Sequence, residues 1–322
     1  MMIKGCIKET IKSIYLRLNK TAAIEDPAPM EIFNSNGEQV KVAYLASDET
    51  AHTPYSIIAG RLPKRVFWDR YNYSLDTHFY TSGNLFHIHN NSARKNAILL
   101  ESELIIPDVY KKVRKDIGYL SKTFENVFTW SKDLLDVLPN ALFVPASGVW
   151  YGTVRWGGDS TGNVKKNKLI SIVSSNKAMC PMHIWRKEVA LHLLDNPKVD
   201  VMGKVVNKYV SCDEIFSNYM YSIVIENAQD DYYFTEKILN CFASRTIPIY
   251  IGARKISSFF NPKGIIEILE PSIEKIDDVI SNCSVEDYIS RTEAIEDNFN
   301  RVQNYLTIED YIANEYPHVF GF

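Results

Sequence analysis

Three polar residues stand together where the sequence predicts the start of a helix. Thr235, Glu236 and Lys237 head the apolar run within the stretch "DDYYFTEKILNCFASRTIPIYIG". The first turn of a helix has free backbone N–H groups and the positive end of the helix dipole, so it attracts phosphate. A lysine is unfavourable for that dipole, and a bound diphosphate would give it a role. The alternative is an ordinary surface lysine on a well-capped helix.

Further candidates lie at the ends of nearby elements. Glu226 and Asn227 close an expected strand over residues 221–227, and open α/β sheets bind ligands at the carboxyl ends of their strands. Arg186 falls in an expected helix over 181–196, after a loop long enough to wrap a ligand. An arginine there could hold a phosphate with two parallel hydrogen bonds. The alternative is a solvated helix arginine.

The sequence does not predict a metal site. Asp230 and Asp231 form an acidic pair of the kind that can hold Mn²⁺, but they precede the expected helix, where aspartate also serves as a cap. We predict caps. Cys180 and His183 lie close together, yet no third ligand follows at a suitable spacing.

A carboxylate in the first half of the chain could act as a general base. Glu101 in "ILLESELIIPDVY" closes an expected strand over 96–102, a position suited to accept a proton from a substrate. Glu103 is its rival, and a surface carboxylate is the alternative for either residue.

The expected elements alternate between strands and helices, which is typical of parallel sheets with crossover connections. Residues 151–167 are rich in glycine and polar side chains, so we expect a linker there. Pro248 counts slightly against a central place for its strand. Beyond 96–102 and 221–227, the expected strands are 40–47, 126–131, 141–147, 168–175, 199–203, 246–252 and 264–269, with a further helix over 234–245.

Length and composition limit the possible classes of protein. The chain has 322 residues, 46% of them hydrophobic, which favours two domains. The net charge of -3 gives no field that would attract nucleic acid. The five cysteines are scattered without a CxxC spacing, so we expect a reducing, cytoplasmic setting rather than a disulfide framework. We expect neither a signal peptide nor a transmembrane segment.

The first twenty residues predict a basic amphipathic helix. Its apolar stripe is Ile3, Ile7, Ile11, Ile14 and Leu18. Five positive charges stand against one negative charge in this segment. Such a helix can lie on an anionic membrane surface, and the alternative is packing on its own domain.

The stretch from residue 225 to 266 resembles the donor-binding segment of the family 10 glycosyltransferases, the α1,3/α1,4-fucosyltransferases. That family has a Glu-Asn pair, then Tyr-x-Thr-Glu-Lys, an apolar helix and a proline-containing strand ending in glycine. Here these are Glu226-Asn227, residues 233–237 and "TIPIYIG". A weaker likeness covers "VDVMGK" and "SNKAMCPMHIWR".

The resemblance implies an α/β fold of two facing Rossmann-like domains (GT-B type) and an inverting transfer from a nucleotide sugar, GDP-fucose in the family. Because the sequence lacks a convincing ligand cluster, we expect that no metal or cofactor is required. By the family's pattern, Glu101 is the closest match to the catalytic base, with Glu103 as rival. The implied donor-binding residues are Arg186, Glu226, Asn227, Tyr233, Thr235, Glu236 and Lys237.

The resemblance also sets expected boundaries and leaves rivals. We expect an acceptor-side domain over 1–160, a donor-binding domain over 161–285 and a helical tail over 286–322 that could cross back to the first domain. Arg245 stands where the family often has glycine, so a UDP-hexose donor stays open, as does a non-catalytic sugar- or nucleotide-binding protein. The implied acceptor is a glycan. If it is lipid-linked, the helix over 1–20 would hold the enzyme at the cytoplasmic membrane face.

Overall fold

The computed structural model describes residues 32–33, 39–47, 56–57, 61–153 and 165–322. The chain divides into two compact units, Met1–Val40 and Lys41–Phe322. In the first unit, β1 (Ile32–Phe33) pairs antiparallel with Gln39 and Val40. The helix expected over 1–20 lies outside the described residues.

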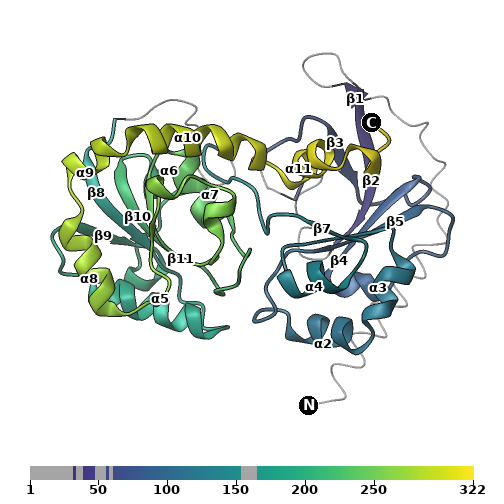
Figure 1. The fold of residues 1–322 in the computed structure, drawn as a ribbon, viewed down its shortest axis with the longest axis horizontal. Coiled ribbons are helices and arrows are strands. Elements are labelled where there is room, and N and C mark those ends of the chain that lie inside the picture. The colour runs from purple at the N-terminus through teal and green to yellow at the C-terminus, as the bar shows by residue number, and fades with distance from the viewer. Residues whose placement is uncertain (1–31, 34–38, 48–55, 58–60, 154–164) are drawn as a thin grey trace. The chain divides into compact units, whose positions relative to one another are not determined.

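Parallel strands in the first half of the second unit form a sheet with helices on its flanks (Figure 1). From Lys41 on, β2 pairs with both β3 and β4, and the order continues through β5 and β6 to β7. The strands are β2 (Gln39–Ala46), β3 (Val66–Asp69), β4 (Thr77–Thr81), β5 (Arg94–Leu99), β6 (Asn126–Thr129) and β7 (Ala141–Phe143). The helices are α2 (Pro107–Lys115), α3 (Ile117–Thr123) and α4 (Lys132–Val137).

Both faces of this sheet are buried. Successive side chains of a strand point to opposite sides, so each strand contributes to two clusters. Phe79 and Phe128 pack in one cluster with residues of α11 (Ile308–Glu315), near the end of the chain. Their neighbours Tyr80 and Val127 pack in the other cluster, with residues of α2, α3 and α4. The last helix of the chain therefore completes the core of the first sheet.

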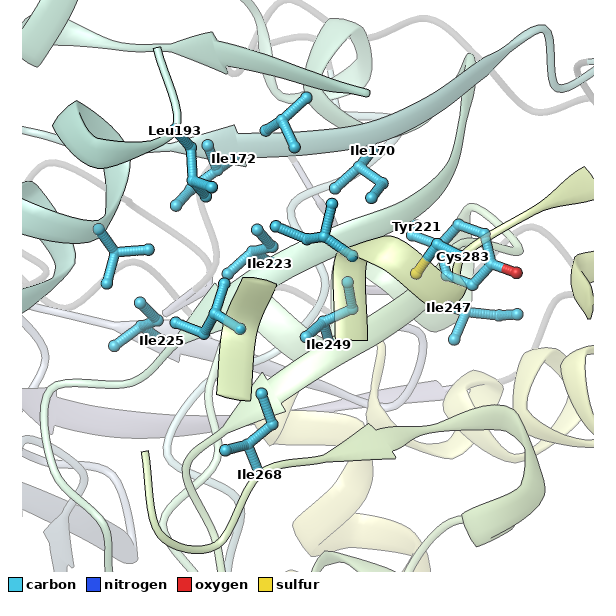
Figure 2. Packing of buried hydrophobic residues seen from close by; sticks show 14 of the residues in the cluster. Ile170, Ile172, Leu193, Tyr221, Ile223, Ile225, Ile247, Ile249, Ile268 and Cys283 are labelled. Carbon is cyan, nitrogen blue, oxygen red and sulfur yellow. The ribbon is translucent and has the colours of Figure 1, made fainter. Parts of the chain in front are cut away.

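The second sheet is also parallel, with the order β12-β11-β10-β8-β9. Its strands are β8 (Lys168–Val173), β9 (Val199–Met202), β10 (Tyr219–Ile225), β11 (Ile247–Ile251) and β12 (Ile266–Glu267). Figure 2 shows isoleucines of three neighbouring strands, Ile172, Ile223 and Ile249, packed together on one face. The helices that follow or separate these strands are α5 (Pro181–His192), α6 (Cys212–Phe216), α7 (Glu236–Ala243), α8 (Ile273–Asn282), α9 (Val285–Ser290) and α10 (Thr292–Val302).

Pro248 lies in β11, between two neighbouring strands, despite its missing N–H. It stands opposite Ser222 of β10, whereas β12 pairs only with Ile249 and Tyr250. The proline therefore precedes the point where the second neighbour begins, and no ladder hydrogen bond on that side is lost.

The predicted α/β class with parallel sheets is confirmed, although several elements were missed. β3, β4, α2, α3, α6 and α8 had no counterpart among the expected elements. Within the described part of the chain, no helix combines the length and the apolar character needed to span a bilayer. The four cysteines that the structure describes are free thiols.

Candidate functional site

A buried carboxylate joins the end of β10 to the start of α7. Glu226 has no exposed surface. Its oxygens accept hydrogen bonds from the Thr235 backbone N (2.9 Å), the Thr235 Oγ1 (2.8 Å) and the Lys237 Nζ (3.0 Å). A buried charge is tolerated when it is paired and fully hydrogen-bonded. Glu226 therefore fixes the helix start beside the carboxyl end of the strand.

Gly252 is required by this packing. A Cβ atom at position 252 would lie 2.3 Å from the Tyr250 hydroxyl oxygen and 2.6 Å from the Glu226 Cγ. The Tyr250 hydroxyl also accepts a hydrogen bond from the Ala253 N at 2.9 Å, which holds the ring in place. The glycine that ends the "TIPIYIG" strand thus makes room for the buried carboxylate.

Thr235 is the N-cap of α7. Its Oγ1 accepts hydrogen bonds from the Lys237 backbone N (3.4 Å) and from the Lys237 Nζ (2.9 Å). The prediction that Asp230 and Asp231 cap this helix was wrong, because the helix begins at Glu236 and the cap must directly precede it. The backbone oxygens of both aspartates instead accept from the backbone N atoms of residues 254 and 255.

Lys237 is partly buried but charged. Its side chain is 25% exposed, and Nζ lies 3.5 Å from a Glu236 carboxylate oxygen. Burial works against the charge, but the carboxylates of Glu226 and Glu236 outweigh it and raise the pKa of Lys237. The ammonium group thus faces two carboxylates on a side chain that is partly exposed.

Arg186 lies in α5, next to the same strand end. Its Nη1 donates to the Ile225 backbone oxygen at 2.9 Å. Burial lowers the pKa of Arg186, and the Glu226 carboxylate opposes that shift. A guanidinium has five N–H donors, and this is the single hydrogen bond that Arg186 makes with the described residues. The remaining donors can serve a ligand.

Asn227 contacts the loop before α5. Its Oδ1 lies 2.9 Å from the His183 Nε2, and its backbone oxygen accepts from the Cys180 Sγ at 3.5 Å. The His183 Nδ1 accepts from the Met179 N at 3.3 Å, which assigns the ring proton to Nε2. Burial and the nearby Arg186 lower the pKa of His183. This histidine is thus neutral and holds Asn227 in place, a role that no sequence pattern indicated.

Tyr233 connects the segment before α7 to Glu101, which follows β5. Its hydroxyl donates to the Glu101 Oε1 at 3.3 Å, and the centroid of its ring lies 4.6 Å from that of the Trp130 ring. Burial, together with the charge of Glu101, raises the pKa of Tyr233 well above its ordinary value, so the phenol stays protonated. The contact with Trp130 was not predicted, because no sequence pattern links two positions so far apart.

Glu101 and Glu103 lie in different surroundings. Glu101 follows the end of β5 by two residues rather than closing the strand, and its Oε1 also accepts from the Ser102 N at 2.8 Å. Glu103 is paired with Arg114 and is 42% exposed. The structure brings Glu101, and not Glu103, to Tyr233.

The described residues contain no group of three or more His, Cys, Asp or Glu side chains that could hold a metal ion. The predicted donor-binding residues fall into three groups. Glu226, Thr235, Glu236 and Lys237 form the buried network, with Arg186 close to it. Asn227 points to His183, and Tyr233 to Glu101.

Comparison of the sequence with known families gives a match over part of the chain. Residues 163–287 match the family described as "Glycosyltransferase family 10 (fucosyltransferase) C-term". The alpha-(1,3)-fucosyltransferase FucT of Helicobacter pylori is 39% identical over 56 residues, which are 17% of this chain and 12% of that protein. The chain thus matches only a small part of this curated relative.

Solved structures are similar to this chain at low sequence identity. The Anabaena protein Alr3699/HepE, in complex with UDP and glucose, has a TM-score of 0.52 and 10% identity over 87% of this chain and all (100%) of that one. An alpha,alpha-trehalose-phosphate synthase from Burkholderia xenovorans has a TM-score of 0.51 and 9% identity, over 76% and 73% of the two chains. An alpha1,3-fucosyltransferase with GDP-fucose has a TM-score of 0.48 and 16% identity, over 89% and 94%.

The two parallel sheets with their flanking helices are thus the Rossmann-like domains of a GT-B fold. The part of the chain that contains β8 to β12 and the buried Glu226 network also matches a family by sequence. Residues 163–287 of this chain are thus similar to the C-terminal part of glycosyltransferase family 10, the fucosyltransferase family.

Proposed function

We propose that this protein is an inverting glycosyltransferase that moves fucose from GDP-fucose to a hydroxyl group of a glycan. The observation that carries the proposal is the Glu226–Thr235–Lys237 network beside Arg186, within the segment that matches family 10. Two cations at a strand end and a helix start are suited to a nucleotide diphosphate. The name of the Helicobacter pylori relative supports fucose as the sugar.

Arg186 and Lys237 have the role of stabilising the leaving group. Negative charge grows on the diphosphate as the bond to the sugar breaks, and fixed cations aimed at that charge lower the barrier. Arg186 has donors that its one hydrogen bond to Ile225 leaves unused. Lys237 supplies its charge from a position that Glu226 and Thr235 fix. Glu236, Asn227 and Tyr233 complete the proposed donor-binding set.

Glu101 is the proposed general base. Its Oε1 is occupied by Ser102 and Tyr233, whereas Oε2 receives no hydrogen bond from the described residues. Oε2 takes the proton of the acceptor hydroxyl group while the hydroxyl oxygen bonds to the anomeric carbon of the sugar. The bond between that carbon and the phosphate oxygen breaks on the opposite side. The products are the glycoside, GDP and a protonated Glu101, which then gives its proton to water, so charge and atoms balance.

The domain roles follow from this assignment. Residues 161–285 bind the donor, residues 1–160 supply the base and bind the acceptor, and α11 within 286–322 packs on the first sheet. A UDP-hexose donor is the second candidate, since UDP-containing complexes share the fold.

A thermal-shift experiment with GDP and UDP tests the donor. A ligand that binds only the folded state raises its stability, so GDP at equal concentration should raise the melting temperature more than UDP. Release of GDP from GDP-fucose in the presence of glycan acceptors then tests for catalysis. A larger shift with UDP would contradict the GDP assignment, and binding without turnover of any nucleotide sugar would identify a binding protein.

We also propose that residues 1–20 attach the enzyme to an anionic membrane surface and that the acceptor is lipid-linked. Each basic residue near such a surface contributes about 1 kcal/mol, and the apolar stripe adds burial. Sedimentation with anionic and neutral vesicles should therefore pellet the full chain, but not a chain without residues 1–20, in a salt-dependent way. Equal pelleting of the two chains would assign the helix to packing on its own domain.

A further inference from the structure

A hollow at the C-terminal end of α2 has a composition that the proposed chemistry does not use. It has a volume of about 540 Å³ and is open to solvent on one side. The lining residues come from the segment after β4 and from α2 and α3, and they are Phe86, His87, Lys112, Lys115, Asp116 and Tyr119.

Two aromatic rings form a fixed wall of this hollow. The rings of Phe86 and Tyr119 are stacked, with centroids 5.8 Å apart and planes at 22°. The Tyr119 hydroxyl donates to the Leu85 backbone oxygen at 2.8 Å, which holds the ring in its orientation. Aromatic rings offer a flat apolar surface on which the face of a sugar ring can pack.

The charge of the hollow is positive. The Lys112 Nζ lies 5.4 Å from the centroid of the Phe86 ring. Lys115 is a second, exposed lysine of the lining. The one acidic lining residue, Asp116, is engaged as the N-cap of α3 and accepts from the Tyr119 N at 3.1 Å. Lysines in the last turn of α2 compensate its dipole, but that role explains neither the stacked rings nor the hollow.

Helix α2, which lines the hollow, also contacts the backbone of the proposed base. The Tyr110 hydroxyl, on α2, donates to the Glu101 backbone oxygen at 3.2 Å. Lys115 ends the same helix, five residues further on, or about 7.5 Å along the helix axis. The half of the chain that is proposed to bind the acceptor therefore contains both the base and this hollow.

We propose that this hollow binds an anionic sugar unit, carrying a phosphate or carboxylate, of the acceptor glycan. The sugar ring packs on Phe86 and Tyr119, and the anionic group pairs with Lys112 and Lys115. The inference rests on the proposed function, because it takes the ligand to be part of the acceptor. The aromatic wall favours a sugar over a bare anion or a lipid headgroup.

Ligand binding measured without a donor tests the hollow directly. Ligand-observed NMR is carried out on the full chain with glucose 6-phosphate, glucose and inorganic phosphate at matched concentrations. The wild type should bind glucose 6-phosphate more tightly than either of the other two. Substitution of both lysines, Lys112→Gln and Lys115→Gln, should weaken glucose 6-phosphate binding by about tenfold, the scale of a lost charge-assisted hydrogen bond.

Two further variants separate the parts of the site. Lys111→Gln removes an exposed charge from the same helix but outside the hollow, so it should leave binding unchanged. Phe86→Leu keeps an apolar side chain but removes the ring, so it should weaken binding of the sugar phosphate and leave that of inorganic phosphate unchanged.

Several results would overturn the proposal. They are no binding of glucose 6-phosphate, equal binding of inorganic phosphate, equal affinity in the double-lysine variant, or lysine-dependent binding to anionic lipid vesicles alone. The GDP thermal shift, measured on the same double-lysine variant, should equal that of the wild type. If the hollow does not bind glucose 6-phosphate but the GDP thermal shift is intact, only this inference is refuted. If the wild type shows no GDP thermal shift, the proposed donor is refuted.

Discussion

The Tyr233 hydroxyl donates a hydrogen bond to the Glu101 carboxylate at 3.3 Å, across 132 residues of sequence. This contact links the proposed base to the family-matching segment. It leaves one oxygen of Glu101 without a hydrogen bond from the described residues, whereas Glu103 is paired with Arg114.

Replacement of the proposed base should separate catalysis from binding. We expect Glu101→Gln to lower the transfer rate by at least about a hundredfold, the lower end of the effect of general-base catalysis. The GDP thermal shift should be unchanged, because Glu101 is not part of the donor network. Glu103→Gln is the matched control and should retain near-normal transfer. An active Glu101→Gln enzyme with an inactive Glu103→Gln enzyme would move the role to Glu103.

Loss of either cation at the donor site should slow transfer strongly. Arg186→Ala or Lys237→Ala should each reduce the rate by about a hundredfold, the scale for removing one group that stabilises transition-state charge. Lys187→Ala, an exposed neighbour in α5, is the control. Rates are measured well below each variant's melting temperature. If both variants are folded and as active as the control, the donor site lies elsewhere.

Replacement of Glu226 should lower the free energy of unfolding. Glu226→Ala leaves the Thr235 N and the Lys237 Nζ without their buried partner, so we expect a loss of about 3 to 5 kcal/mol in the free energy of unfolding. Urea denaturation measures this loss. Glu226→Gln keeps the shape and one acceptor oxygen, and its cost should be smaller. A cost below about 1 kcal/mol for the alanine variant would mean that the network is not tightly coupled.

Transfer should not require a metal ion. Because two fixed cations are proposed to neutralise the leaving diphosphate, activity should survive an excess of EDTA. The assay is GDP release with and without the chelator. Complete loss of activity that Mn²⁺ restores, and that Asp230→Asn or Asp231→Asn prevents, would make the acidic pair a metal site after all.

The first sheet should become less stable as the pH rises. Glu309 in α11 is fully buried, with the Ile57 N and the Trp68 Nε1 as donors to one oxygen. Burial raises the pKa of Glu309 from 4.5 to about 7. The folded state therefore holds this proton more tightly than the unfolded state does. The stabilisation is complete below about pH 4.5 and falls by about 3 kcal/mol as the pH rises to about 7.

The variant Glu309→Gln isolates this effect. Its unfolding free energy, compared with that of the wild type between pH 4.5 and 7, should lack the falling contribution. Glu315→Gln, an exposed site at the end of the same helix, should keep the wild-type slope. Parallel pH profiles for the wild type and Glu309→Gln would mean that Glu309 is ionised in the folded protein.

The sequence by itself determined the elements whose cause is local. The apolar β-branched runs produced β8, β10 and β11 within about two residues of their expected limits, because such side chains suit a strand buried on both faces. Thr235 before an apolar helix and Glu226-Asn227 after a strand are local signals too. They were sufficient for the family resemblance and for the donor-site residues proposed from it.

The tertiary structure decided which of these residues meet. The meeting of Tyr233 with Glu101, of Asn227 with His183, and of Lys237 with Glu226 joins different elements. No periodicity within one element encodes such contacts, since they depend on how strands and helices pack. The same reason explains the wrong prediction for Asp230 and Asp231. A suitable residue type was present, but the helix begins where Glu226, which follows β10, can hold Thr235.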